Sequence, residues 1–306
     1  LLGVTVAETY GGANLGYLAH MIAMEEISRA SASIALSYGA HSNLCVNQIH
    51  RNGTEAQKQK YLPGLISGEQ VGALAMSEPG AGSDVVGMRL RAEKRGDRYV
   101  LNGTKMWITN GPDADTLVVY AKTNPEAHQR GITAFIVDAD TPGLDSTEHI
   151  EVMAPHPLAT LKFKDCEVPA SAQLGALNGG FKLAMQTLDI FRASVAGAAL
   201  GFARRALAEA VAHAKQRRMF GQTLADFQLT QAKLGDMAAL VDAGAGCVAV
   251  TQGARGALVV TADEVIEVPA YPVEVVDTTG CGDAFSAGFL RGLSLGRDLR
   301  GAAQLG

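Results

Sequence analysis

The segment best equipped for chemistry is a glycine-rich turn that follows a short apolar run. It reads Leu74-Ala75-Met76-Ser77-Glu78-Pro79-Gly80-Ala81-Gly82-Ser83-Asp84 and carries the hydroxyls of Ser77 and Ser83. Backbone amides in such a turn can bind a pyrophosphate or the carbonyl edge of a flavin, because glycine lets the backbone approach a ligand closely. Taken alone, the pattern indicates either an anion-binding loop or an ordinary surface loop.

A second segment, Met106-Trp107-Ile108-Thr109-Asn110-Gly111, lies about thirty residues further on and contains the only tryptophan of the chain. Together the two segments resemble the signature of the acyl-CoA dehydrogenase family. Tyr10-Gly11-Gly12 and Met24-Glu25-Glu26-Ile27-Ser28-Arg29 extend the resemblance. Over residues 1–145 it is closest to the isovaleryl-CoA dehydrogenase branch.

The resemblance implies that FAD is the cofactor and that both segments line it. Trp107 is expected to cover the isoalloxazine ring, Thr109 to face its N5 edge, and Ser83 to lie near the substrate as well. A plain core aromatic remains the alternative role for Trp107. The residues expected to line the flavin are Leu74, Met76, Ser77, Gly82, Ser83, Trp107, Ile108 and Thr109.

Residues 146–243 resemble a different branch of the same family. Arg217-Arg218-Met219-Phe220-Gly221-Gln222, followed by Phe227-Gln228, is similar to a second flavin-contacting stretch of that family. The resemblance implies that Arg217, Phe220 and Gln228 contact the FAD of a neighbouring subunit, where a forked, permanently charged guanidinium suits a pyrophosphate. The alternative for Arg217 is a solvated helix C-terminus.

The catalytic base that the family requires has no match here. The family removes the substrate's α-proton with a glutamate, and general-base work needs a carboxylate at hydrogen-bond range. The base position of the isovaleryl branch falls on Phe191, in Leu188-Asp189-Ile190-Phe191-Arg192. Asp189 is expected to pair with Arg192 at i, i+3, and a carboxylate held in an ion pair is a poor base. Ser83, Asp189 and Arg192 are the predicted substrate contacts.

The last 63 residues, 244–306, have a different composition, since they contain no Lys, Met or His. Asp277-Thr278-Thr279-Gly280-Cys281-Gly282-Asp283 resembles the signature of ribokinase-like sugar kinases. There the amides of Gly280 to Gly282 would form an anion hole at a helix N-terminus, and Asp283 would take the proton of a sugar hydroxyl. The alternative is an appended segment without function.

Periodicity predicts an α+β chain with a helical part over 1–70, an antiparallel β domain over 71–168 and further helices over 169–243. The resemblances imply that 169–243 is a truncated C-terminal helical bundle and that 244–306 is an α/β kinase-like tail. Leu15, Leu18, Ile22 and Ile27 form an apolar helical stripe, and Thr54 to Gln57 a capping box. Asn102-Gly103 predicts the turn of a hairpin over 98–109. The other expected strands are 71–76, 117–121, 132–137, 160–168, 247–250, 257–260 and 265–268, and the other expected helices are 179–218, 223–243 and one starting near Gly282.

Composition excludes several classes of protein. The net charge of −5, without a basic block, argues against nucleic acid as a binding partner. The sequence contains no run of 18 apolar residues, so no membrane-spanning helix is predicted. Four scattered cysteines predict neither a metal site nor disulfides and fit a reducing compartment, the cytoplasm or a mitochondrial matrix. The start at Leu1-Leu2-Gly3, without Met, suggests that a longer protein precedes it.

The predicted function is FAD-dependent α,β-dehydrogenation of a short acyl-CoA thioester, with electrons passing to an electron-transfer flavoprotein. Two alternatives stay open: a flavin- or CoA-binding module without turnover, because Phe191 replaces the base, and a fragment of an ATP-dependent sugar kinase. The family forms tetramers, so a homo-oligomer is expected, although much of that interface is missing from the pattern.

Overall fold

The computed structural model describes residues 1–153, 155–243, 247–251, 256–261, 265–270, 285, 288–289, 291–293 and 295–305. The chain divides into two compact units, Leu1–Arg205 and Ala206–Gly306. None of the helices in these described ranges is long and apolar enough to cross a membrane. Cys45 and Cys166 are free and buried, and burial raises the pKa of the Cys45 thiol to about 12.

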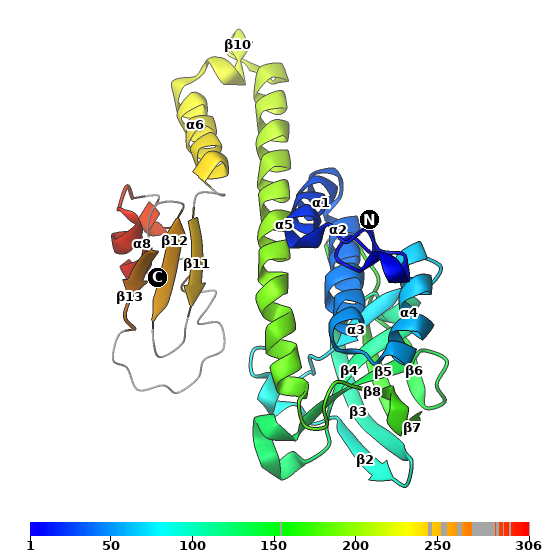
Figure 1. Cartoon of the computed structure of the whole chain (residues 1–306). Helices are drawn as coiled ribbons and strands as arrows, with labels where there is room; N and C mark the ends of the chain where they lie inside the picture. Colours follow the sequence, from blue (N-terminus) through cyan, green and yellow to red (C-terminus); the bar gives the residue numbers. More distant parts are fainter. Residues whose placement is uncertain are drawn as a thin grey trace. The chain divides into compact units, whose positions relative to one another are not determined.

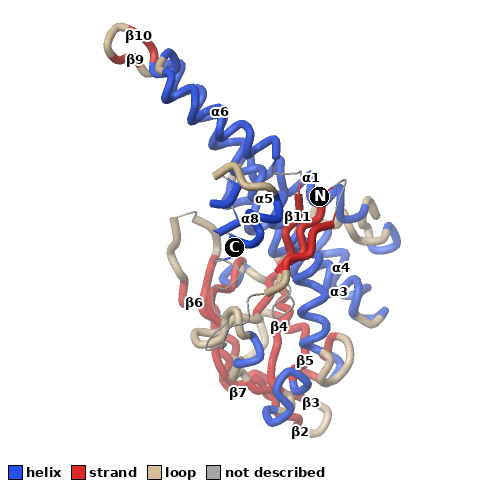
Figure 2. Tube along the Cα trace, turned by 90° about the vertical axis from the view of Figure 1, so that its left-hand side faces the viewer, coloured by secondary structure: helices blue, strands red, loops and turns tan. Residues whose placement is uncertain are grey.

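The first unit opens with helices that lie at one end, while strands β2, β3 and β7 lie at the other (Figure 1, Figure 2). The predicted capping box is present at Thr54, whose hydroxyl accepts from the Gln57 amide while the Gln57 side chain accepts from the Thr54 amide. The helices of this part are η1 (Glu8–Tyr10), α1 (Gly16–Ala30), α2 (Ala32–Gly39), η2 (Ala40–Val46), α3 (Asn47–Asn52) and α4 (Glu55–Ser67).

Of the apolar stripe predicted from Leu15 to Ile27, only Ile27 packs against a buried cluster. Leu15, Leu18 and Ile22 are 66%, 71% and 56% exposed. The buried face of α1 carries His20, Met24 and Ser28 instead. The polar His20 is accepted there because its ring stacks on Tyr38 and both ring nitrogens have hydrogen-bond partners.

An eight-stranded sheet follows, in the order β6-β7-β3-β2-β4-β5-β8, with β1 paired parallel to β4 and the neighbouring pairs mostly antiparallel. Its strands are β1 (Gly72–Ala75), β2 (Arg91–Arg95), β3 (Arg98–Thr109), β4 (Thr116–Lys122), β5 (Ile132–Asp138), β6 (Leu144–His149), β7 (Leu158–Pro169) and β8 (Gln173–Leu174). Strand β4 is buried along its whole length because both faces of the sheet are covered. Val118 and Tyr120 join a core shared with the helices, whereas Leu117 and Val119 join a second core within the sheet.

The predicted hairpin at Asn102-Gly103 is wrong, since β3 runs through both residues. The register of β3 against β7 shifts between Leu101 and Gly103, so this Asn-Gly forms a bulge. Gly103 has a φ of +141°, and a Cβ there would lie 2.8 Å from Cα of Leu90. The reversal lies earlier, between β2 and β3, where Gly96 has a φ of +63°.

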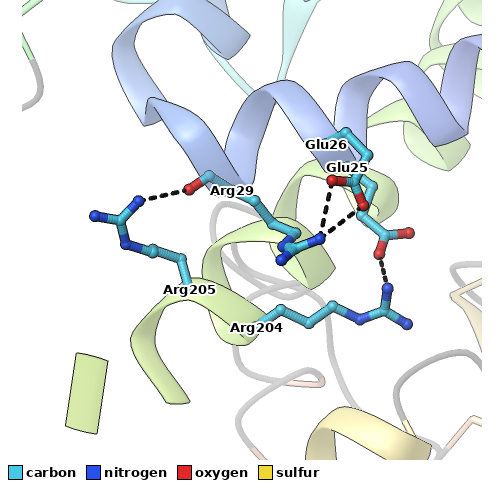
Figure 3. A network of polar contacts seen from close by, with 5 residues as sticks. All are labelled: Glu25, Glu26, Arg29, Arg204 and Arg205. Atoms are coloured by element: carbon cyan, nitrogen blue, oxygen red, sulfur yellow. Dashed lines mark hydrogen bonds and ion pairs between the residues drawn. The ribbon is translucent and has the colours of Figure 1, made fainter. Parts of the chain in front are cut away.

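Helix α5 (Gly180–Gln216) follows the sheet and packs along α1. A Cβ on Gly201 would lie 2.7 Å from Cβ of Ser28, so the two helices approach closely at this glycine. Arg204 forms an ion pair with Glu25, Arg29 pairs with Glu26, and Arg205 donates to the carbonyl of Arg29 at 3.2 Å (Figure 3). The contacts of Arg204 and Arg205 join the last turns of α1 to α5, whereas the Arg29–Glu26 pair lies within α1.

The second unit contains a two-stranded β9–β10 ribbon, helix α6 and an antiparallel sheet β11-β12-β13. The predicted strands of the tail are confirmed, and α8 buries Ala302 and Ala303 against Val259 and Ile266. The predicted helix start at Gly282 and the motif 277–283 lie outside the described residues. The elements are β9 (Arg218–Met219), β10 (Gln222–Thr223), η7 (Leu224–Asp226), α6 (Gln228–Ala243), β11 (Cys247–Thr251), β12 (Ala257–Thr261), β13 (Val265–Val268) and α8 (Leu299–Leu305).

Candidate functional site

The two segments singled out in the sequence lie against each other. The Met106 amide donates to the Ser77 carbonyl at 2.9 Å, and the Lys105 ammonium donates to the Met76 carbonyl at the same distance. The glycine-rich turn, which follows strand β1, therefore begins in contact with the end of β3. The two segments are therefore in direct contact, as a shared site would require.

A buried ion pair joins the same two segments. Nζ of Lys105 lies 2.8 Å from Oε1 of Glu78, and the two side chains are 0% and 6% exposed. The Glu78 carboxylate also accepts from the backbone amides of Arg89, at 2.6 Å, and Leu90, at 3.0 Å. Burial lowers the pKa of Lys105 to about 8, although Glu78 acts in the opposite direction. This pair was not predicted from the sequence. The sequence feature that could have indicated it is a lysine within a predicted strand.

The glycine-rich turn beyond Glu78 is open on its outer side. Glu78 and Ala81 exchange backbone hydrogen bonds of 2.9 and 3.1 Å, which closes a tight turn. Gly80, Gly82 and Ser83 are exposed, and a Cβ on either glycine would meet no neighbour. A hollow of about 340 Å³ lies beside the turn, lined by Glu78, Pro79, Gly80, Gly87, Arg89, Leu90, Gly103 and Thr104.

Trp107 projects from a distorted part of β3. The register against β7 shifts between Lys105 and Ile108, and Trp107 has a φ of +63°. Its side chain is 55% exposed, so it is not a plain core aromatic, whereas Ile108 is buried. Asn110 fixes the end of this strand, since its amide donates to the carbonyls of Ser37 and Gly72 at 2.9 and 3.2 Å.

The chemistry of these donors fits a flat, polar-edged ligand such as a flavin. Among the residues that the structure describes, the hydroxyls of Ser77, Ser83 and Thr109 have no hydrogen-bond partner, so they are available to a ligand. An exposed indole presents a π-face suited to stacking on an aromatic ring. Leu74 and Met76 pack in the core beneath, with Val85 and Met88 of the same loop.

The predicted substrate contacts on α5 form an ion pair of their own. Oδ1 of Asp189 lies 2.7 Å from Nη1 of Arg192, as the i, i+3 spacing predicted, and both side chains are well exposed. Phe191, at the expected base position, is half-buried and lies beside Gly39 at the end of α2: its Cε2 is 3.5 Å from where a Cβ on Gly39 would stand. An aromatic ring at this point cannot accept a proton.

The other predicted cofactor residues lie elsewhere in the chain. Arg217, Phe220 and Gln228 belong to the second unit, whereas Met76 and Trp107 belong to the first. All three are exposed, and Phe220 has a φ of +51° in the β9–β10 turn. Asp283 lies outside the described residues. Within the part of the chain that the structure describes, no cluster of three or more His, Cys, Asp or Glu could hold a metal ion.

Comparison with known families assigns these parts. Residues 1–69 match the acyl-CoA dehydrogenase N-terminal domain, and residues 73–166 match the acyl-CoA dehydrogenase middle domain. Through these two domains the chain belongs to the acyl-CoA dehydrogenase family. Residues 207–306 match the pfkB family of carbohydrate kinases, which confirms the kinase resemblance of the tail.

Individual relatives agree with this assignment. The mitochondrial isovaleryl-CoA dehydrogenase of Pongo abelii is 54% identical over 241 residues, which cover 78% of this chain and 57% of that protein. Butyryl-CoA dehydrogenase from Megasphaera elsdenii is a structural neighbour with a TM-score of 0.76 and 41% identity, covering 79% of this chain and 65% of that one. The chain thus spans less than two thirds of the length of these relatives.

Two further solved structures are relevant to cofactor and partner. A chain from work on the electron transferring flavoprotein of Acidaminococcus fermentans has a TM-score of 0.77 and 41% identity, covering 79% of this chain and 64% of that one. The FAD complex of PigA has a TM-score of 0.74 and 31% identity, with the same two coverages.

Proposed function

We propose that this chain binds FAD and is an acyl-CoA dehydrogenase in scaffold and ancestry, with a short acyl-CoA thioester as its ligand. The observation that supports the proposal is the hydrogen bond from the Met106 amide to the Ser77 carbonyl, because it joins the two segments. Ser77, Ser83, Trp107 and Thr109 of these segments are here called the flavin ridge. The FAD complex of PigA and the name of the isovaleryl-CoA relative support the cofactor and the acyl-CoA class.

Each residue of the ridge then has a part in binding. Trp107 stacks on the isoalloxazine ring, while Ser77, Ser83 and Thr109 donate to its polar edge. FAD, when bound, supplies hydride acceptance from the β-carbon of the thioester. Ser83, Asp189 and Arg192 contact the substrate in this proposal, and Arg217, Phe220 and Gln228 contact the cofactor of a second copy in a homo-oligomer.

The proposed domain limits are 1–70, 71–168, 169–243 and 244–306. The kinase family match begins at residue 207, before the last of these limits. An electron-transfer flavoprotein is the proposed electron acceptor, and the structural neighbour from work on the Acidaminococcus fermentans flavoprotein supports it. The buried free thiols of Cys45 and Cys166 support a reducing compartment.

Proton removal separates an enzyme from a binding module. Phe191 cannot act as a base, and the Asp189 carboxylate is held by Arg192. We therefore favour binding of flavin and acyl-CoA without efficient turnover as the property of this chain itself. Anaerobic titration of the FAD-loaded protein with isovaleryl-CoA or butyryl-CoA tests this: little bleaching of the flavin is expected, and full bleaching would contradict it.

A restored carboxylate provides the matched test. Phe191→Glu should increase the rate of flavin reduction by acyl-CoA by at least about a hundredfold, the usual size of a general-base contribution. Phe191→Gln, of the same size but without a base, is the control and should not. Equal rates in the two variants would show that position 191 does not place a carboxylate at the α-proton.

The sugar-kinase alternative rests on the pfkB family match over residues 207–306. Its expected catalytic residue is Asp283, in the motif 277–283. Calorimetric titration with Mg-ATP tests it directly, since a phosphotransferase must bind the nucleotide. Absence of heat would remove this alternative.

A further inference from the structure

One carboxylate holds both ends of the open turn. Glu78 stands at its start, and the amides of Arg89 and Leu90, which its side chain accepts from, stand at its end. The same carboxylate receives the ammonium of Lys105, which begins the bulged part of β3, residues 105–108, here called the Trp107 bulge. Three stretches that are distant in sequence therefore meet at a single buried group.

We propose that Glu78 and Lys105 act as a positioning pair that holds loop 79–88 and the Trp107 bulge in one relative geometry, so that neutralising either side chain releases both. The consequence for flavin binding rests on the proposed function. The consequence for the geometry of Trp107 does not, because it concerns the protein alone.

Because the pair is buried, the loss of either charge should have a large effect on the local structure. Removing one partner of a buried pair leaves an uncompensated charge, whereas replacing both partners often restores a neutral, packed interior. Glu78 is the charged group that faces Lys105; the other neighbours are the Met76 carbonyl, the sulfur of Met88 at 3.8 Å and Leu161 on the paired strand β7. Because these other neighbours carry no net charge, nothing among the described residues around Lys105 takes over its role when its ammonium is neutralised.

The same sheet offers a matched control. Lys162 and Glu148 pair across β7 and β6 at 2.6 Å, but their side chains are 54% and 50% exposed. Exposed pairs contribute little because water screens them. Lys162→Met should leave the glycine-rich loop and the Trp107 bulge undisturbed, whereas Lys105→Met should disturb both.

The first experiment uses the flavin-free 306-residue chain and the fluorescence of Trp107, its only tryptophan. Lys105→Met and Glu78→Gln should each shift the emission maximum and change acrylamide quenching, and the double variant should return toward wild type. Because burial places the pKa of Lys105 at about 8, wild-type emission should also titrate near that pH. The titration should vanish in Lys105→Met and persist in Lys162→Met.

The second experiment measures FAD affinity by titrating the apoprotein. Each single variant should bind FAD about tenfold or more weakly, which corresponds to losing one modest interaction, and Lys162→Met should bind as wild type does. If wild type takes up no FAD, the proposed function fails while the Trp107 measurements still decide the positioning pair. If the single variants do not fold, circular dichroism will show it, and the wild-type pH titration and the double variant decide instead.

The proposal is overturned if wild-type Trp107 emission follows the same pH dependence as that of the variants that lack Lys105, or if folded single variants match the Lys162→Met control in emission and quenching. Wild-type FAD affinity in folded single variants would likewise show that the pair does not position the site.

Discussion

His20 lies at the centre of a hydrogen-bond chain that joins α1, η2 and α5. Ser42 donates to the Tyr38 carbonyl at 2.7 Å and therefore accepts from Nε2 of His20, also at 2.7 Å. On the other side Asn43 donates to Ser194 at 2.7 Å, and Ser194 donates to Nδ1 of His20 at 3.2 Å. Burial lowers the pKa of His20 to about 4, so the ring is neutral at pH 7 and, with its proton on Nε2, accepts the Ser194 hydroxyl at Nδ1.

The hydrogen-bond chain around His20 predicts that the protein loses stability in acid. Burial lowers the pKa of His20 from 6.5 to about 4, so between these values the unfolded state binds more protons than the folded state. The stabilisation is complete above pH 6.5 and falls as pH drops toward 4. Wild type should lose about 2 kcal/mol more than His20→Gln between pH 7 and pH 5, measured by urea unfolding. Equal losses would contradict the neutral-ring assignment.

Residue-level prediction from the sequence succeeded where partners are local. The Asp189–Arg192 pair follows from i, i+3 spacing and is present in the structure. The Glu78–Lys105 pair was not foreseen because the two residues are 27 positions apart, and only the pairing of the strands brings them together. The burial of His20 was missed because an exposed apolar stripe on the same helix gave the stronger pattern.

At the scale of elements, the Asn102-Gly103 bulge gives a direct test. Gly103→Ala forces a Cβ to within 2.8 Å of the Leu90 backbone, at a φ of +141°. We expect a loss of about 2 kcal/mol or more, because both overpacking and backbone strain contribute. Gly96→Ala has a positive φ but open space around it, so it should lose only about 1 kcal/mol. Comparable urea midpoints for the two variants would argue against the bulge.

The contact between α1 and α5 gives a second test. A Cβ on Gly201 would overlap the backbone of Glu25 and lie 2.7 Å from Cβ of Ser28, so Gly201→Ala should destabilise by about 1–3 kcal/mol. Gly235→Ala, on α6, meets no neighbour and should instead stabilise by up to about 1 kcal/mol through helix propensity. Thermal unfolding checks both signs. A stabilising Gly201→Ala would mean that the helices do not approach as described.

Strand and helix prediction was accurate where periodicity is strong, as in β4, β5, β7 and α5. It failed at Asn102-Gly103 because the same dipeptide suits a two-residue turn and a bulge, and only the length of the partner strand β7 distinguishes them. Prediction of the site had the same limit. Its two segments were recognisable in the sequence, whereas their contact through Ser77 and Met106 depends on the tertiary pairing.

At the scale of the whole molecule, the chain combines two families. Its acyl-CoA dehydrogenase part supplies both segments of the flavin ridge within one compact unit, and its C-terminal part matches a carbohydrate kinase family. The other predicted cofactor contacts, Arg217, Phe220 and Gln228, fall in the second unit. The central question is therefore whether the ridge of the first unit suffices to hold FAD.

The visible absorption spectrum of the purified full chain, recorded before and after gel filtration and after incubation with FAD, answers that question most directly. We expect flavin bands that remain with the protein through gel filtration, together with quenching of Trp107 emission by the stacked ring. A colourless protein that takes up no FAD on incubation, with unchanged Trp107 emission, would contradict this expectation.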